Sequence, residues 1–334
     1  MSHRLASDRP VASALDGKSV LVTGGTGSFG RAFTRAVLET TGVRRVIIFS
    51  RDELKQWEIR QQHPDEDRLR FFIGDVRDHA RLLRAFDGVD IVVHAAALKQ
   101  VVATEYNPME AVKTNIHGAQ NVIEAAIDRD VERVVALSTD KACSPTNLYG
   151  ATKLVSDKLF VHGNSYVGAH RTRFSVVRYG NVFGSRGSVL PVFQRHAEAG
   201  VLPITDERMT RFWISLDQAA VFVLACLGSM EGGEVFVPKL PSFRIVDLAR
   251  AVAPRAELAV IGIQPGEKLH EELISAHDAR RSVDAGRCYV VRPGAGPTGA
   301  LNGWAPLPDG FSYRSDTNPE WIGTDELREA IGRV

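Results

Sequence analysis

Residues 18–30 read Lys-Ser-Val-Leu-Val-Thr-Gly-Gly-Thr-Gly-Ser-Phe-Gly, and this stretch decides the fold. The apolar run predicts a short buried strand, and residues 31–39 after the glycines predict a helix. A glycine turn between strand and helix lets the backbone approach a pyrophosphate, which the amides at the helix start can bind. The sequence therefore predicts a dinucleotide site at Gly24, Thr26, Gly27, Ser28, Phe29 and Gly30.

The next predicted strand, residues 45–49, indicates which dinucleotide is bound. It ends at Ser50 and Arg51, where an NAD-binding fold would place an acidic residue on the ribose 2′-hydroxyl. A hydroxyl and a guanidinium suit a 2′-phosphate better, so NADP is favoured over NAD. Asp52 and Glu53 follow at once and could still serve a 2′-hydroxyl. Further positions expected at the cofactor are Lys55, Asp75, Val76, Ala95, Ala96 and Lys99.

Strands and helices alternate up to about residue 170, which predicts an α/β fold with a Rossmann-type, doubly wound parallel sheet. After residue 180 glycine and proline interrupt the pattern, as a smaller C-terminal substrate-binding lobe would require. We expect a polar tail over 1–17, an NADP-binding domain over 18–180 to which later strands return, and mainly the substrate lobe over 181–334. His94 ends an apolar strand and is expected to be packed and hydrogen-bonded rather than catalytic.

The fifth predicted strand, residues 131–137, leads into Ser138-Thr139-Asp140-Lys141. Ligands of open parallel sheets gather at the carboxyl ends of strands, so these side chains should face the dinucleotide. Tyr149 and Lys153 stand four residues apart at the start of a predicted helix and share one face. A nearby ammonium lowers the pKa of a phenol, so Tyr149 could take a proton from a sugar or alcohol hydroxyl. An isolated Tyr-x-x-x-Lys is more often a half-buried tyrosine beside a surface lysine, and only the context favours chemistry.

Together, residues 23–30, 95–97, 138–141 and the Tyr149/Lys153 pair resemble the extended short-chain dehydrogenase/reductase superfamily that acts on nucleotide sugars. Five blocks also resemble the inverting UDP-N-acetylglucosamine 4,6-dehydratases, which make the first intermediate of pseudaminic acid. These blocks are residues 49–56, 72–78, 178–182, 209–213 and 265–271. The likeness runs from about Lys18 to about Ile274, and a fainter one returns at 312–318.

The resemblance implies a hydro-lyase mechanism. Tyr149, with its pKa lowered by Lys153 and the nicotinamide, would take the C4 hydroxyl proton while hydride moves to NADP. Lys141, kept partly neutral, would remove the C5 proton, and Asp140, partly protonated, would donate to the departing C6 hydroxyl. Hydride would return to C6 and a proton would reach C5 from the opposite face, which inverts C5. Thr139 would lie by the C4 hydroxyl.

The resemblance also implies substrate contacts. Asn181 would hold the diphosphate of a UDP-sugar, Arg211 would bind phosphate, and Lys99 would contact substrate or cofactor. Glu267, beside Lys268, would sit in a loop that closes over the nucleotide. The histidine and proline usual after the family lysine are replaced here, at positions 100 and 102, by glutamine and valine. This departure leaves the local sugar contacts open.

Three other activities remain open at this point. A C4 epimerase would share everything except the need for Asp140 and Lys141. A C5-retaining dehydratase would carry methionine in place of Tyr149, and these enzymes are often membrane-anchored. A non-catalytic NADP-binding regulator would have lost Tyr149 or Lys153.

Composition excludes some partners and suggests a compartment. A formal net charge of +1 over 334 residues gives no reason to expect nucleic acid or an anionic membrane as partner. Three cysteines without metal-ligand spacing predict no metal and suit a reducing cytoplasm. The first 17 residues lack the apolar core of a signal peptide, and the apolar run 219–227 is too short to span a bilayer and predicts a buried helix. A homo-oligomer is expected from the resemblance.

Overall fold

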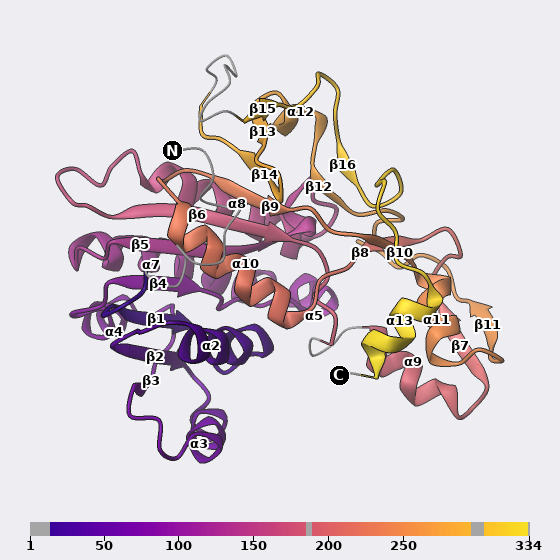
Figure 1. The fold of residues 1–334 in the computed structure, drawn as a ribbon, viewed down its shortest axis with the longest axis horizontal. Coiled ribbons are helices and arrows are strands. Elements are labelled where there is room, and N and C mark those ends of the chain that lie inside the picture. The colour runs from indigo at the N-terminus through magenta and orange to yellow at the C-terminus, as the bar shows by residue number, and fades with distance from the viewer. Residues whose placement is uncertain (1–13, 185–188, 295–303, 333–334) are drawn as a thin grey trace.

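The structure, a computed structural model, describes residues 14–184, 189–294 and 304–332. Its main element is a ten-stranded sheet in the order β15-β13-β14-β9-β6-β5-β4-β1-β2-β3 (Figure 1). Pairs from β3 to β9 are parallel, and β14, β13 and β15 add an antiparallel edge. The strands are β1 (Ser19–Thr23), β2 (Arg45–Ser50), β3 (Leu69–Ile73), β4 (Ile91–His94), β5 (Arg133–Thr139), β6 (Arg173–Tyr179), β9 (Val235–Pro238), β13 (Ser282–Asp284), β14 (Cys288–Val291) and β15 (Ala305–Pro306).

Helices cover both faces of this sheet, so its central strands are buried on both sides and read as continuous apolar runs. On one face α2 packs against α10, and on the other α7 lies between α4 and α8 (Figure 1). The order β3-β2-β1-β4-β5-β6 is that of a Rossmann fold, as predicted. The helices are α2 (Ser28–Thr40), α3 (Glu53–Gln62), α4 (His79–Ala85), α5 (Val101–Tyr106), α6 (Pro108–Val112), α7 (Gly118–Asp128), α8 (Leu148–Gly163), α10 (Leu216–Ser229) and α12 (Ala276–Ala279).

A smaller lobe with its own apolar core lies beside the carboxyl edge of the sheet, at the right of Figure 1. Phe193, Trp213 and Leu327 are buried in that core. Two-stranded pairs and short helices build the lobe and its connection to the sheet. They are α9 (Val189–Ala197), β7 (Val201–Ile204), β8 (Thr210–Phe212), β10 (Ser242–Arg244), α11 (Ile245–Val252), β11 (Glu257–Val260), β12 (Glu272–Ile274), β16 (Tyr313–Arg314) and α13 (Thr324–Ile331).

The later half of the chain supplies β9, β13, β14 and β15 to the main sheet, so the two lobes interleave along the sequence. Residues 1–13 of the predicted tail lie outside the described residues, whereas Leu15 is fully buried in the main core. The predicted helix after residue 115 begins with a π-helical turn, Lys113–His117, before α7. Residues 219–227 lie within α10, whose face toward the sheet is buried. Among the described residues, no helix is both long and apolar enough to cross a membrane.

Two glycines of the β1–α2 turn are required by close backbone contacts. Gly24 has φ +65°, and a Cβ there would lie 2.9 Å from the Cα of Ala96. A Cβ at Gly30 would lie 2.5 Å from the carbonyl oxygen of Gly25. Only glycine therefore lets α2 begin this close to β1, as the spacing of the glycines predicts.

Gly30→Ala should destabilise the fold, because backbone atoms that cannot rotate away occupy the space of the new methyl group. We expect a loss of about 1–3 kcal/mol in the free energy of unfolding, measured by denaturant titration. Gly332→Ala is the matched control: Gly332 has helical φ of −67°, and its nearest contact is 3.6 Å away. Equal stability of the two variants would contradict the packing argument.

Candidate active site

A cavity of about 1380 Å³ lies at the carboxyl ends of the parallel strands and extends to the smaller lobe. Its size exceeds that of an ordinary drug-sized pocket and suits two ligands together. The predicted site residues are all described, and all but Glu53 and Asp140 line this cavity. Those that line it are Gly24, Thr26, Gly27, Ser28, Phe29, Gly30, Ser50, Arg51, Asp52, Lys55, Asp75, Val76, Ala95, Ala96, Lys99, Thr139, Lys141, Tyr149, Lys153, Asn181, Arg211 and Glu267.

The glycine turn forms an anion site at one end of the cavity. Gly27 is the N-cap of α2, and within this described helix start no side chain caps the amides and no acidic residue occupies the first turn. The first amides of a helix carry partial positive charge and have no partner within the helix. The turn therefore fits the pyrophosphate of a dinucleotide, and a Cβ at Gly24 would fill part of the cradle.

The end of β2 carries the groups expected at the ribose. The Oγ of Ser50 accepts a hydrogen bond from Nε2 of Gln56 at 3.0 Å. Asp52 caps α3 by accepting from the amide of Lys55 at 3.0 Å, and it also pairs with the ammonium of Lys55. The side chain of Arg51 is 58% exposed, with Nη1 3.7 Å from Oδ2 of Asp75. Asp52, an acidic residue that could serve a 2′-hydroxyl, is thus engaged as a helix cap. The guanidinium of Arg51 is instead largely exposed to solvent at the cavity.

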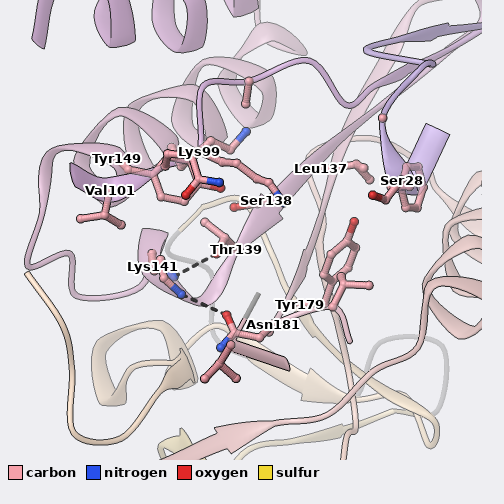
Figure 2. A pocket seen from close by; sticks show the side chains of 18 of the residues that line it. Ser28, Lys99, Val101, Leu137, Ser138, Thr139, Lys141, Tyr149, Tyr179 and Asn181 are labelled. Atoms are coloured by element: carbon pink, nitrogen blue, oxygen red, sulfur yellow. Dashed lines mark hydrogen bonds between the residues drawn. The ribbon is translucent and has the colours of Figure 1, made fainter. Parts of the chain in front are cut away.

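Thr139 ends β5, and Asp140 and Lys141 form the 3-10 turn that follows, η2 (Asp140–Ala142). Thr139 donates from Oγ1 to Oδ1 of Asp140 at 2.7 Å. Nζ of Lys141 donates to that same oxygen at 3.2 Å. It also donates to Oδ1 of Asn181, after β6, at 3.2 Å (Figure 2). The side chain of Asp140 is fully buried, so it lies behind Lys141 and Thr139 and does not face the cavity.

Tyr149 and Lys153 lie on one face of α8, as their spacing predicts, and both are buried. Asn147 caps this helix by accepting from the amide of Gly150 at 2.8 Å. A Cβ at Gly150 would lie 2.1 Å from the carbonyl oxygen of Lys141, so the first turn of α8 rests directly on η2. This contact places the phenol and the ammonium of Lys141 at the same wall of the cavity (Figure 2).

The charge state of Tyr149 differs from the sequence-based expectation. Burial raises the pKa of Tyr149 to about 12, although Lys141 and the hydroxyl of Thr139 oppose the rise. Burial also lowers the pKa of Lys153. Without the cofactor, desolvation of the phenolate outweighs the nearby cations, and a phenol pKa lowered by Lys153 together with the nicotinamide stays a prediction for the cofactor-bound protein.

The charge state of Lys141 also differs from expectation. Burial acts to lower its pKa, but the carboxylates of Asp140 and Glu271 outweigh burial and raise the pKa above its usual value. The site was expected to keep Lys141 partly neutral, and instead the protein's own groups hold it as an ammonium. Asn181 supports that form, because its carbonyl oxygen accepts from Nζ.

The surroundings of two other residues considered in the sequence, His94 and Lys99, lower the pKa of each side chain. His94 is buried at the end of β4, with Nδ1 2.8 Å from Oγ1 of Thr23, and burial lowers its pKa to about 3. It is the packed histidine that the sequence predicted. Burial also lowers the pKa of Lys99, and the charge of Lys141 lowers it further. Lys99 and Lys141 both line the cavity (Figure 2).

The segment 264–272 packs onto the turn after β5. Lys268 donates from Nζ to the carbonyl oxygen of Cys143 at 2.5 Å, and Asn147 donates to the carbonyl oxygen of Gly266 at 2.8 Å. Glu272 accepts from Oγ of Ser144 at 2.6 Å. The predicted loop thus touches the turn after β5 as well as the cavity.

Sequence reasoning missed Glu271. Its side chain is 3% exposed and lines the cavity, with Oε1 3.4 Å from Nζ of Lys141 and 3.5 Å from Nε of Arg211. It lies inside the block 265–271 that carries the family resemblance. A second acidic residue follows it directly, so the sequence offers no signal that this carboxylate is the one that turns inward.

Comparison with known proteins identifies the family. A model described as "Polysaccharide biosynthesis protein" matches residues 20–293. The chain is 51% identical over 330 residues to "UDP-N-acetylglucosamine 4,6-dehydratase (inverting)" of Campylobacter jejuni subsp. jejuni serotype O:23/36, covering 96% of this chain and 98% of that protein. The chain belongs to the inverting UDP-N-acetylglucosamine 4,6-dehydratase family.

The chain is also similar to a UDP-glucose 4-epimerase and to a protein of known structure. A UDP-glucose 4-epimerase of Rickettsia canadensis is 41% identical over 282 residues, covering 82% of each chain. The solved structure of Pen from Bacillus thuringiensis matches with a TM-score of 0.88 and 36% identity, covering 96% of this chain and 98% of that one. The dehydratase match is longer and more similar than the epimerase match.

The phenol of Tyr149 should stay protonated in the cofactor-free protein until the pH approaches about 12. The phenolate absorbance of the wild-type protein and of Tyr149→Phe, compared in the ultraviolet, should therefore coincide up to about pH 9. Loss of one tyrosinate signal in the variant near neutral pH would show that the protein's own cations control the phenol.

Proposed function

We propose that this protein is a C5-inverting UDP-N-acetylglucosamine 4,6-dehydratase. Its product would be UDP-2-acetamido-2,6-dideoxy-β-L-arabino-hex-4-ulose, formed by transient oxidation at C4, loss of water across C5 and C6, and hydride return to C6. The observation that carries the proposal is the pair of Asp140 and Lys141, in contact at 3.2 Å beside Tyr149 and a dinucleotide cradle. The close relatives named as inverting dehydratases support it.

The same pair argues against the alternative activities. A C4 epimerase moves a hydride off and back onto C4, and it needs no second acid and base at C5 and C6. A charged lysine against a fully buried carboxylate costs desolvation energy, so the presence of this pair favours a functional role. A C5-retaining dehydratase of this superfamily carries methionine where Tyr149 stands, and a non-catalytic regulator needs neither Tyr149 nor Lys153.

We assign the following roles to the chain's own residues. NADP, when bound on the glycine turn, supplies the hydride acceptor and donor. Tyr149 takes the C4 hydroxyl proton, and Lys153 lies one helical turn further along the same face. Lys141 takes the C5 proton, which the C4 ketone has made acidic. Asp140 supplies the proton for the C6 hydroxyl, and the hydroxyl of Thr139, 2.7 Å from Oδ1 of Asp140 and lining the cavity, connects it to the substrate.

Cations on the substrate side support a UDP-sugar as ligand. Lys99, Arg211 and Lys268 line the cavity together with Asn181 and Glu267. A diphosphate carries charge that suits such a group. We therefore propose Asn181 and Arg211 as diphosphate contacts, Lys99 as a contact to sugar or cofactor, and Glu267 as part of the loop over the nucleotide.

Several assignments stay predictions. We propose residues 18–180 as the main cofactor domain and 181–334 as mainly the substrate lobe. Cytoplasmic location suits the three buried free cysteines among the described residues. Homo-oligomeric assembly and a place at the first step of pseudaminic acid biosynthesis follow from the family resemblance.

Incubation with UDP-N-acetylglucosamine in deuterated water, followed by NMR, tests the activity. We expect a new C6 methyl group, deuterium at C5 and the L-arabino configuration. Lys141→Met should give no C6 methyl group while the reduced nicotinamide still forms, because C4 oxidation does not use Lys141. A simple C4 epimer, or retained configuration at C5, would refute the proposal.

We also propose NADP as the preferred cofactor, with Arg51 and Lys55 as partners of the 2′-phosphate. Arg51→Ala should weaken NADP binding about tenfold or more, because a charge-assisted hydrogen bond to phosphate is lost, and should change NAD binding less than about threefold. Isothermal titration with each cofactor measures both constants. Arg60→Ala serves as control, because it removes an exposed guanidinium from α3, the helix that follows Arg51, and Arg60 does not line the cavity. Equal weakening of both cofactors would argue against a 2′-phosphate contact.

A further inference from the structure

We propose that Glu271 is a positioning residue that accepts the proton of Lys141 and so turns this lysine into a base. The inference rests on the proposed dehydratase activity and deepens it. Glu271 immediately precedes β12, 130 residues after Lys141 in the sequence. Its Oε1 lies 3.4 Å from Nζ of Lys141, and the side chains are 3% and 23% exposed.

The second carboxylate oxygen of Glu271 points to proton exchange. Oε2 is buried and has no hydrogen-bond partner among the described residues. A buried carboxylate oxygen without a donor is costly, and protonation removes that cost by neutralising the charge. Glu271 thus has one oxygen that holds Lys141 in place and one that is available to carry a proton.

Asp140 is less suited to this role. Its hydrogen bonding does not distinguish it from Glu271, because each carboxylate has one oxygen engaged by Lys141 and one buried oxygen without a partner among the described residues. It does not line the cavity, whereas Glu271 does. Asp140 is also the acid proposed for the C6 hydroxyl, so it must keep its own proton. A second carboxylate is therefore needed to take the proton of Lys141.

Charges from all neighbouring elements enter this equilibrium. Asp140 on η2 and Arg211 on β8 face the Lys141/Glu271 pair, and the phenol of Tyr149 approaches from α8. Lys99, in the segment after β4, is a further cation whose charge interacts with that of Lys141. With Asp140 protonated, as its role as the acid requires, Glu271 is the anion that faces the cations of Lys141 and Arg211. Moving a proton from Lys141 to Glu271 breaks an N–H bond, forms an O–H bond and leaves the net charge unchanged. Loss of water from the pair favours the neutral forms over the ion pair, so a bound substrate would drive this transfer.

The proton count closes over one turnover. Neutral Lys141 takes the C5 proton, and Asp140 gives its proton to the departing C6 hydroxyl. The C4 hydroxyl proton, held by Tyr149, balances the proton that C5 receives afterwards. Lys141 then passes its proton to Asp140 and recovers one from Glu271, which restores the starting state with no net uptake or release of protons.

The test separates C4 oxidation from water elimination in Glu271→Gln and Glu271→Asp. Absorbance of the reduced nicotinamide reports the first step, and the C6 methyl signal reports elimination. Wild-type elimination should be flat between about pH 6.5 and 8.5, because Lys141 loses its proton internally. Glu271→Gln should keep C4 oxidation but slow elimination about 100-fold at neutral pH. Its rate should then rise about tenfold per pH unit, because Lys141 must now lose its proton to solvent.

Two comparisons make the test decisive. Glu271→Asp keeps the carboxylate and should restore the flat pH profile, and Glu272→Gln, a carboxylate change at the next residue, should leave the profile flat. A Glu271→Gln variant with wild-type elimination would overturn the proposal. A Glu271→Gln variant in which the rates of C4 oxidation and elimination both fall by the same factor at every pH would also overturn the proposal, because it would show that Glu271 has only a structural role. If the wild-type protein forms only a C4 epimer, the dehydratase assignment itself fails, and this result is distinct from both.

Discussion

The geometry of the site depends on one close approach, between Gly150 at the start of α8 and the carbonyl oxygen of Lys141. A Cβ at position 150 would lie 2.1 Å from that oxygen, so no other residue fits without moving the helix or the turn. Because α8 cannot slide along η2, Tyr149 and Lys141 keep a fixed relation although they come from different segments. The Asn147 cap and the Lys268 bond to Cys143 hold the two sides of this contact.

A buried ionic network beneath this contact ties the same elements to the sheet. Asp157, two turns after Tyr149 on α8, accepts from Oγ of Ser138 at 2.7 Å and from Nη2 of Arg178 at 3.2 Å. Arg178 also donates to the carbonyl oxygen of Leu273, just before the end of β12. Removing one member would leave a buried charge without its partner, which is strongly destabilising. The network therefore joins β5, β6, α8 and β12, which are the elements that carry or flank Thr139, Asn181, Tyr149 and Glu271.

Local patterns explain which features the sequence predicts well. The glycine spacing predicts the β1–α2 turn because the contact of Gly30 with Gly25 lies within the turn itself, and the Tyr149/Lys153 spacing places both on one helical face. Local patterns do not predict the role of Glu271, because it lies 130 residues after Lys141 and contacts it only in the folded protein. They do not predict the pKa of Tyr149 either, because burial is a property of the packed fold. The position of Asp140 behind Lys141 likewise depends on the backbone conformation of η2, which the Asp-Lys dipeptide alone does not predict.

A lysine that is charged at rest is compatible with a lysine that acts as a base. Lys99, Lys141, Arg211 and Lys268 together make the substrate side of the cavity positive, and a UDP-sugar diphosphate is attracted to such a surface. A neutral Lys141 in the open site would lose that attraction. Once substrate replaces water, the ion pair loses the solvation that stabilised its two charges, and the same carboxylate that raised the pKa of Lys141 becomes the nearest place for its proton. The charged Lys141 therefore first attracts the diphosphate of the substrate. Once the substrate is bound, Lys141 gives its proton to Glu271.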